Sequence, residues 1–352
     1  MDFTLSEEQT MIAEAFRGQL TRDVTLDVIR TQAALGQAGK SPTDQGLWQQ
    51  LTEMGLPGLL IDDTYGGAGL GMLEAVVVGQ ELGRAAAPVP FAATCVMAPL
   101  AITASAEVEQ HKTWLTQIAA GEMRVGVALG ADMLQVDSGR ISGHARFVFD
   151  AGGATHFLLE TGGVFYLVEA HASGVYLTLE RPFDPLQSLG HLALDTVPAT
   201  PLSGVSVDRV TEAGRIALAA QTIGACEFLL DASVEYAADR VQFGRPIGSF
   251  QAIKHMCAEM AAQLYPAISL VWYAGYVFDK DAARSPLNSL LAKALADEAG
   301  RFISRTAIEV HGGMGYTDLQ GLHYWYKRAA FNRNLLGNPE ELRQDIAAMQ
   351  GI

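Results

Sequence analysis

Basic residues are scarce in this chain of 352 amino acids. Lys and Arg together number 24 against 39 Asp and Glu, which gives a formal net charge of −15. Because so acidic a protein repels phosphate groups, and no basic patch interrupts the excess, we expect neither nucleic acid nor an anionic membrane as a partner. Apolar residues make up 49% of the sequence and charged residues only 18%, which argues against general disorder.

Cysteine is rare as well. The three cysteines are Cys95, Cys226 and Cys257, which lie far apart and form no Cys-x-x-Cys pair. This spacing argues against a disulfide framework or a zinc site, the histidines lack metal-ligand spacing, and no metal is expected. The acidic N-terminus does not resemble a signal peptide. The most apolar stretch, residues 216–230, is too short and too polar to cross a bilayer, so we expect a cytoplasmic protein.

The pattern of helix and strand signals changes twice along the chain. We expect an N-terminal helical domain (1–120), a middle β domain (121–205) and a C-terminal helical domain (206–352), which is an α+β class. Long helices are expected near 208–240, 250–279 and 286–310, and Pro266 should kink or split the second. This order counts against a doubly wound dinucleotide fold. The glycine-rich loop at 66–71 also lacks that fold's third glycine, because the next residue is Met72.

A carboxylic acid stands among apolar residues in the helix expected at 208–240. Alternating steps of four and three place six residues on one stripe: Ile216, Ala220, Ile223, Glu227, Leu230 and Val234. Burial raises the pKa of a carboxyl group, and enzymes use such groups as bases. The alternative is that Glu227 reaches solvent at the edge of the stripe, or forms a structural ion pair with Arg215 or Arg240.

Four segments carry a resemblance to a known family. The chain reads RVQFGRPIGSFQ at 240–251, which resembles the RxxFGxxxxxFQ signature of acyl-CoA dehydrogenases, and VHGGMGY at 310–316, which resembles their QxxGGxGY segment. Residues 3–9 and 47–69 resemble the family's N-terminal half. The resemblance covers essentially the whole chain. It implies an acyl-CoA dehydrogenase-like fold with a helical N-terminal domain, a β-barrel-like middle domain and a C-terminal four-helix bundle.

The resemblance also implies a reaction. These enzymes convert an acyl-CoA to its trans-2-enoyl-CoA with FAD as hydride acceptor, and in one branch the base lies thirteen residues before the Arg of the RxxFG motif, which is Glu227 here. In the commoner branch the base follows the GG segment, but that spacing falls on Leu336 and Gly337, which cannot take a proton. Glu340 and Glu341 lie nearby, after an Asn-Pro pair that is typical of the start of a surface helix.

The same resemblance assigns a cofactor site. The implied FAD-binding residues, some of which serve a neighbouring subunit, are Arg240, Gln242, Phe243, Gln251, Glu309, Val310, His311, Gly312 and Gly313. A guanidinium suits a pyrophosphate and bare glycines present backbone N–H groups, although Arg240 alone could be a solvated cation at a helix end. The implied partners are an acyl-CoA, an electron-transfer flavoprotein, and either a homotetramer or a heterotetramer with a second acyl-CoA dehydrogenase subunit.

Three departures from the family point to a heteromeric assembly. Residues 127–132 read VALGAD where the family's flavin-facing loop resembles TEPGAGSD, Glu309 replaces a Gln, and the chain is short. We therefore expect one subunit of a heteromeric enzyme, of the kind found in bacterial degradation of steroid side chains. Two alternatives stay open: a non-catalytic subunit that completes a partner's FAD site, and an acyl-CoA oxidase-like activity.

Overall fold

The computed structural model describes residues 4–106, 108–131 and 133–352, so Phe3 and Asp132, which belong to the segments compared above, lie outside it. The described residues form two compact units. Unit 1 contains residues up to 26, 72–87 and 215–352, and unit 2 contains residues 27–71 and 88–214. Each unit is described by itself.

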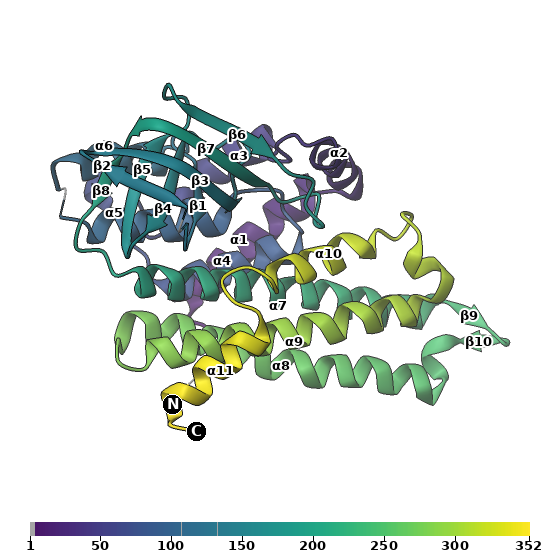
Figure 1. The fold of residues 1–352 in the computed structure, drawn as a ribbon. Coiled ribbons are helices and arrows are strands. Elements are labelled where there is room, and N and C mark those ends of the chain that lie inside the picture. Colours follow the sequence, from purple (N-terminus) through teal and green to yellow (C-terminus); the bar gives the residue numbers. More distant parts are fainter. Residues whose placement is uncertain (1–3, 107, 132) are drawn as a thin grey trace. The chain divides into compact units, whose positions relative to one another are not determined.

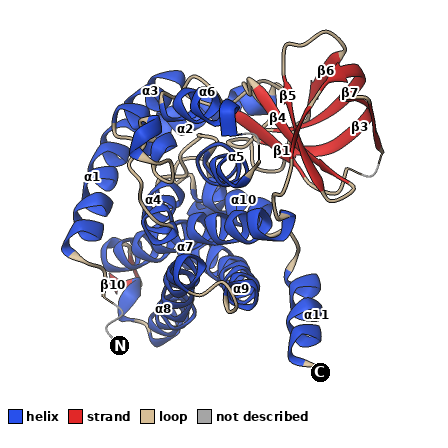
Figure 2. Ribbon diagram, turned by 90° about the vertical axis from the view of Figure 1, so that its left-hand side faces the viewer, coloured by secondary structure: helices blue, strands red, loops and turns tan. Residues whose placement is uncertain are grey.

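Unit 2 is built around a mixed β-sheet. Its strands are β1 (Val125–Ala128), β2 (Leu134–Asp137), β3 (Arg140–Phe149), β4 (His156–Thr161), β5 (Val164–Glu169), β6 (Val175–Leu179), β7 (Leu189–Pro198) and β8 (Thr200–Leu202). They pair in the order β6-β7-β3-β1-β4-β5-β8, with β2 beside β3. β1 and β4 run parallel, with Val127 opposite Leu158, and the other pairs are antiparallel (Figure 2).

Helices and apolar side chains complete unit 2. The helices are α2 (Leu26–Gln37), α3 (Gln45–Glu53), η1 (Leu56–Gly58), η2 (Asp63–Tyr65), η3 (Phe91–Met97), α5 (Ala98–Ala104) and α6 (Val108–Ala119). η3 is a π-helix, which has wider turns than the α-helix α5 that follows it. The sheet contributes one apolar cluster, which includes Ile141, Phe157 and Leu192.

Unit 1 is helical. Its elements are α1 (Glu7–Asp23), α4 (Met72–Arg84), most of α7 (Val207–Asp239), β9 (Val241–Gln242), β10 (Arg245–Pro246), η4 (Ile247–Ser249), α8 (Gln251–Lys280), α9 (Ser285–His311), η5 (Gly312–Tyr316), α10 (Leu322–Asn332) and α11 (Pro339–Gln350). α8 packs along α9, and α9 also contacts α10 and α11 (Figure 1). The expectation of an α+β chain with helical ends and a central sheet is confirmed.

Local signals explain where several helices begin. Ser6 caps α1 in a capping box with Gln9, and Asn338 caps α11 in the same way with Glu341. The expected start of a surface helix at Asn338 is therefore confirmed. The three long helices of unit 1 lie within a few residues of their expected bounds.

Pro266 does not split its helix, so that part of the expectation was wrong. α8 runs without interruption from Gln251 to Lys280. Proline removes one hydrogen-bond donor, but Leu264, Ala267 and Ile268 around it are buried, while Pro266 itself faces outward. The packing of these neighbours holds the helix together across the missing hydrogen bond.

The apolar stripe expected on α7 needs a correction. Ile216, Ala220, Ile223 and Leu230 are buried as expected, but Val234 is 50% exposed. The helix is apolar on nearly every side in its middle turns, as expected for a helix in the core. Among the described helices it alone is long and apolar enough to cross a bilayer by length and composition, yet 78% of its most apolar window is buried inside the structure.

Candidate active site

Two helical glycines bring α4 and α7 into backbone contact. A Cβ added to Gly224 would lie 1.8 Å from the carbonyl oxygen of Gln80, and one added to Gly83 would lie 2.0 Å from that of Gln221. No side chain fits in these gaps, so the crossing requires glycine at both positions. The close approach places the side chain of Gln80 against that of Glu227, one turn further along α7.

Glu227 is half-buried at this crossing and is held by a hydrogen bond from an amide. The Nε2 of Gln80 donates to Glu227 Oε2 at 2.7 Å, and the Nε1 of Trp272 on α8 donates to Gln80 Oε1 at 2.8 Å. Burial raises the pKa of Glu227, and the hydrogen bond from Gln80 opposes this rise because it stabilises the charged form. The carboxyl group thus has the properties expected of a base.

Charged side chains surround this amide–carboxylate pair. Arg84 Nη2 lies 2.7 Å from Asp231 Oδ2, one helical turn beyond Gln80 and Glu227 on the same two helices. Arg17 on α1 forms a bidentate pair with the buried Glu81 at 2.7 and 2.9 Å. Arg84 and Arg17 lower the pKa of Glu227 and Glu81 raises it, but all three effects are smaller than that of burial.

The structure does not support the two ion pairs considered for Glu227. Arg215 instead donates from Nε to the carbonyl oxygen of Leu336 at 2.9 Å. Arg240 lies thirteen residues beyond Glu227, which corresponds to about 20 Å along the helix axis. The expected base and the expected cofactor arginine therefore lie at separate places on one element.

The hairpin segment, residues 240–251, projects from the end of α7. Arg240, Gln242 and Gln251 are exposed, and Phe243 is 91% exposed in a left-handed conformation with φ of 54°. The tight β9–β10 turn requires that conformation, which costs energy for a residue with a side chain. The segment presents a guanidinium, two amides and an aromatic ring to the outside of the protomer.

The glycine segment, residues 309–313, lies at the same end of α7. Val310 and His311 are buried, and the His311 ring stacks on Tyr236 of α7 with ring centroids 4.3 Å apart. The Nδ1–H of the ring donates a hydrogen bond to the carbonyl oxygen of Ala307 at 2.8 Å, and burial lowers the pKa of the imidazole. His311 is therefore an internal packing residue whose side chain faces the helices.

Gly312 and Gly313 leave the backbone bare beside this packed histidine. Both are exposed, Gly312 has a φ of 59°, and a Cβ added to either would meet no atom within 4 Å. This open backbone can approach a ligand and offer N–H groups to an anion. The structure thus brings the hairpin and glycine segments to one end of α7.

Glu309 is exposed on α9 and does not stand alone as a charge. It lines a hollow of about 270 Å³ together with Arg301, Phe302, Arg305 and Thr306. Arg305, one turn earlier on the same face, partly offsets its negative charge, whereas Arg301 is engaged by Glu298 at 2.9 Å. The replacement of the family's Gln by Glu309 is therefore less unfavourable for an anionic ligand than the sequence indicates.

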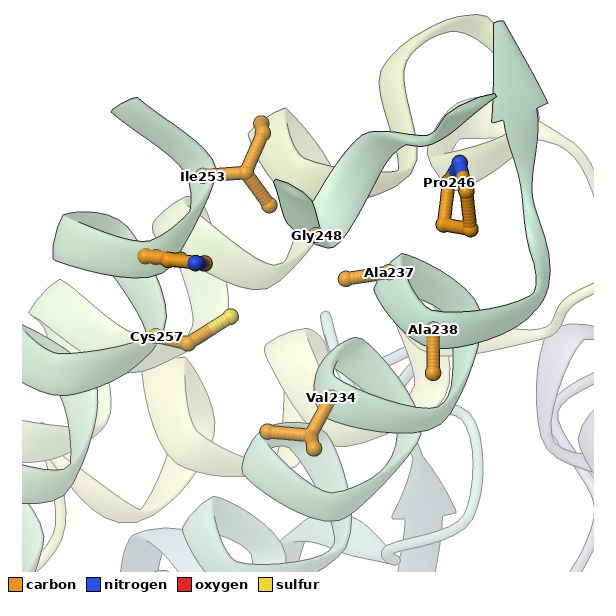
Figure 3. Close-up of a pocket in the computed structure, with 8 residues that line it drawn as sticks. Val234, Ala237, Ala238, Pro246, Gly248, Ile253 and Cys257 are labelled. Carbon is orange, nitrogen blue, oxygen red and sulfur yellow. The ribbon is translucent and has the colours of Figure 1, made fainter. Parts of the chain in front are cut away.

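A second hollow, of about 340 Å³, lies where α7, η4 and α8 meet (Figure 3). Val234, Ala237 and Cys257 point into it, and its lining is almost wholly apolar. Neither hollow is lined by Glu227. The exposure of Val234 noted above follows from its position at this opening.

In the loop that follows β1 in unit 2, a backbone N–H group is already bonded to a side chain of the same unit. Glu160 Oε2 accepts a hydrogen bond from the Gly130 N–H at 2.7 Å, and its Oε1 accepts one from Gly163 at 2.8 Å. Glu160 is nearly buried. In this chain a carboxylate thus occupies a backbone donor of the loop that stands where the family has its flavin-facing loop.

The two other glutamates considered as a base both have structural partners. Glu340 forms an ion pair with Arg333 at 3.0 Å, and Glu341 accepts a hydrogen bond from the Asn338 N–H at 3.1 Å. Both belong to the first turn of α11. These roles favour Glu227 over either of them.

Comparisons with known proteins agree with this architecture. The model of the acyl-CoA dehydrogenase N-terminal domain matches residues 6–122, and that of the C-terminal domain matches residues 205–350. Acyl-CoA dehydrogenase IpdE2 of Mycobacterium tuberculosis is 32% identical over 341 residues, which cover 96% of each protein. The chain belongs to the acyl-CoA dehydrogenase family. Members of this family are flavin-dependent oxidoreductases, so the sequence-based prediction of family and enzyme class is confirmed.

Other acyl-CoA dehydrogenases are similar along the whole chain. The solved ChsE4–ChsE5 complex from Mycobacterium tuberculosis superposes with a TM-score of 0.91 at 26% identity and covers 100% of this chain and 99% of that one. The Tcur3481–Tcur3483 steroid ACAD gives 0.90 at 29% identity, with 99% of both chains covered. FadE34 of the same bacterium as IpdE2 is 28% identical over 98% of this chain, but the match spans only 48% of FadE34.

Sequence reasoning on this acyl-CoA dehydrogenase missed Gln80 and Trp272. A signal for Gln80 was present, since a polar Gln-Glu pair interrupts the apolar run of residues 75–82 in α4. No local pattern indicated that Trp272 would donate to Gln80, because the two residues are 192 positions apart.

Proposed function

We propose that this chain oxidises an acyl-CoA to its trans-2-enoyl-CoA, with Glu227 as the base that removes the α-proton. The observation that carries the proposal is the carboxyl group itself. It is half-buried among apolar helices, its pKa is raised by burial, and its position matches the base of one branch of the family.

The residues of unit 1 supply the proton chemistry. The ionised Glu227 takes the proton from the carbon next to the thioester carbonyl, and a raised pKa makes the carboxylate a stronger base in that step. FAD, when bound, supplies the acceptor for the hydride that leaves the β-carbon, so one proton and one hydride leave the substrate together. The neutral acid that forms suits the apolar surroundings better than the carboxylate did.

The hairpin and glycine segments fit a dinucleotide that carries a pyrophosphate. Arg240 offers a fork of donors, Gln242 and Gln251 offer amides, and the exposed Gly312 and Gly313 offer bare backbone. Because Arg240 is about 20 Å from Glu227 along α7 and faces outward, we propose that these residues hold the FAD of a neighbouring subunit. Phe243, Glu309, Val310 and His311 complete the same two segments, with His311 in a supporting role.

Anaerobic bleaching of the bound flavin tests the assignment of the base. A panel of short straight-chain, branched and steroid-like acyl-CoA thioesters is screened on the wild-type protein, expressed alone and together with a neighbouring dehydrogenase subunit. Glu227→Gln is expected to lower the bleaching rate by at least about a thousandfold, as losses of essential catalytic groups do. The matched control is Glu235→Gln, which removes the same charge from an exposed site on α7. Bleaching of Glu227→Gln at the wild-type rate would show that another group is the base.

We further propose that the active form is a heterotetramer with a second acyl-CoA dehydrogenase subunit, and that an electron-transfer flavoprotein accepts the electrons. Two solved structures that are similar to this chain are two-component assemblies, and one of them is described as a steroid ACAD. The match with this chain spans only 48% of FadE34, so FadE34 contains a further region of similar length. We therefore propose a steroid-like acyl-CoA as the preferred substrate class. The cytoplasm is the location that the sequence predicts.

A supporting subunit that completes a partner's FAD site is the second candidate function. The Glu160 carboxylate favours it, because it takes the N–H of Gly130 in the loop that should face the flavin. FAD content after expression alone and after co-expression with a neighbouring dehydrogenase gene separates the possibilities. Stoichiometric FAD in the singly expressed chain contradicts the need for a partner, and a co-expressed complex that bleaches equally well with Glu227→Gln supports the second candidate.

A further inference from the structure

We propose that Gln80 is the positioning residue for the base: its amide holds one carboxylate oxygen of Glu227 and leaves the other to receive the proton. This inference rests on the proposed function, in which Glu227 is the base. It concerns a residue of α4 that lies outside every motif of the sequence comparison.

The amide of Gln80 is fixed at both of its ends. Its oxygen accepts a hydrogen bond from Trp272 Nε1 at 2.8 Å, and its nitrogen donates to Glu227 Oε2 at 2.7 Å. The indole N–H is only a donor, so it determines which end of the amide faces the carboxylate. Gln80 is 5% exposed, and the backbone contact at Gly224 keeps it at the crossing.

The two oxygens of Glu227 therefore differ. Among the described residues, Oε2 accepts the bond from Gln80 and Oε1 accepts none. A rotating carboxylate would have to be ordered in each turnover, whereas one fixed oxygen leaves the other in a defined direction. A neutral amide can do this without becoming an ion pair, which would lower the basicity of the carboxylate much further.

The charged groups around the pair are engaged with one another, and their effects on the pKa of Glu227 are smaller than that of the hydrogen bond from Gln80. On α4, Arg84 is engaged by Asp231 of α7, and Glu81 is engaged by Arg17 of α1. α8 faces the pair with the neutral Trp272. The one uncharged donor to Glu227 is therefore the group whose removal changes its protonation most directly.

The pH dependence of flavin bleaching tests the inference, with the thioester that bleaches the wild-type chain fastest as the probe. In Gln80→Met the carboxylate loses its donor, so the acidic limb should move to higher pH. Below the limb the rate should fall by roughly tenfold, the factor that matches one hydrogen bond to a charged group. Above it a smaller loss should remain, because the carboxylate that Gln80 no longer holds must be ordered in each turnover. An equal loss at every pH with an unmoved limb overturns the inference.

Two further variants sharpen this test. Trp272→Phe keeps an aromatic ring but frees the amide to turn, so the limb should move in the same direction by a smaller amount, and no movement contradicts the anchoring role. The matched control is Gln9→Met. Gln9 is likewise held at both ends, by Ser6 N–H at 2.9 Å and by Glu74 Oε1 at 2.7 Å, but it lies outside the crossing and should not move the limb.

A second measurement needs neither flavin nor substrate. In a double-mutant cycle on unfolding, Gln80→Met and Glu227→Gln should be coupled more strongly at pH 8 than at pH 4, by roughly tenfold in the folding equilibrium constant, because higher pH favours the charged carboxylate that accepts the bond from Gln80. Coupling that is independent of pH overturns the inference. If the flavin bound to Glu227→Gln is still bleached at the wild-type rate, the proposed function fails and this inference fails with it. If Glu227→Gln is inactive but the limb of Gln80→Met is unmoved, only this inference fails.

Discussion

The two ends of the segment from Glu227 to Arg240 are built in opposite ways. At Glu227, α7 is pressed against α4 at a glycine contact, and the acidic side chain is half-buried and held by a fixed amide. At Arg240 the helix ends, and several side chains of the hairpin segment are exposed on the protomer, among them Arg240, Gln242 and the 91% exposed Phe243. At the first end the hydrogen-bond partners of the acidic side chain come from the same chain. At the second end the polar side chains are exposed and can bind a group outside the protomer.

In the proposed function, this difference separates proton chemistry at Glu227 from cofactor binding at Arg240 within one chain. A base needs a fixed, partly dry environment, which only tertiary packing can supply. A segment that serves a neighbouring subunit must remain exposed in the protomer, at some cost in local strain, as the positive φ of Phe243 shows. The comparison predicts that substitutions at the first end change the stability of the chain, and that those of the exposed side chains at the second end change ligand binding with little effect on stability.

The largest expected effect on stability is at the glycine contact. In Gly224→Ala the new methyl group meets the carbonyl oxygen of Gln80 at a distance that no real Cβ shows, so the helices must separate. We expect a loss of about 3 kcal/mol in the free energy of unfolding, the upper range for overpacked cores. Chemical denaturation measures it.

Gly18→Ala is the control for this substitution. Gly18 lies within α1 and has no neighbour closer than 3.8 Å to an added Cβ, so alanine should stabilise the chain by about 0.5–1 kcal/mol through helix propensity. Equal stability of the two variants would mean that α4 and α7 are not in backbone contact.

Arg240→Gln should weaken FAD binding and leave the stability of the chain nearly unchanged. Because the side chain is exposed, the free energy of unfolding of the FAD-free chain should stay within about 0.5 kcal/mol of the wild type. FAD binding to the assembled protein should weaken by about 10- to 100-fold, the equivalent of one charge-assisted hydrogen bond. Titration of the apoprotein with FAD measures this. Arg245→Gln on the same hairpin, whose guanidinium lies 4.1 Å from the Phe250 ring, should retain FAD, and equal loss in both variants argues against a specific role for Arg240.

The sequence predicted the bounds of the helices and the candidate residues Glu227 and Arg240 better than it predicted which residues contact them. Periodicity located α7 to within about one residue at each end, because helix signals are local, and the resemblance pointed to Glu227 and Arg240. Periodicity misplaced Val234, which is exposed beside a hollow. The rule that proline breaks a helix was wrong at Pro266, where α8 continues. Periodicity has a further limit. It could not reveal Gln80, since that hydrogen bond joins residues 147 positions apart and depends on how closely two helices pack.

The smallest expected effect concerns pH and stability, and it needs no ligand. Since burial raises the pKa of Glu227 above its usual 4.5, its contribution to stability is fully present below that pH and is lost as pH rises through the folded-state value. Glu227→Gln removes this loss and keeps a hydrogen-bonding amide beside Gln80. The variant should therefore be more stable than the wild type at pH 8, by about 1 kcal/mol, as is common when a functional charge is replaced, and the difference should vanish near pH 4.

The other end of α7 supplies a control of opposite sign. Burial lowers the pKa of His311 below its usual 6.5, so its contribution to stability is present above that pH and is lost as pH falls. His311→Gln should therefore flatten the fall in stability between pH 7 and pH 5 and leave the alkaline side unchanged. Unfolding curves of the three proteins from pH 4 to 8 decide the matter. If Glu227→Gln gains nothing at pH 8 while His311→Gln behaves as expected, Glu227 is well solvated in the folded chain, and the contrast between the two ends of α7 does not hold.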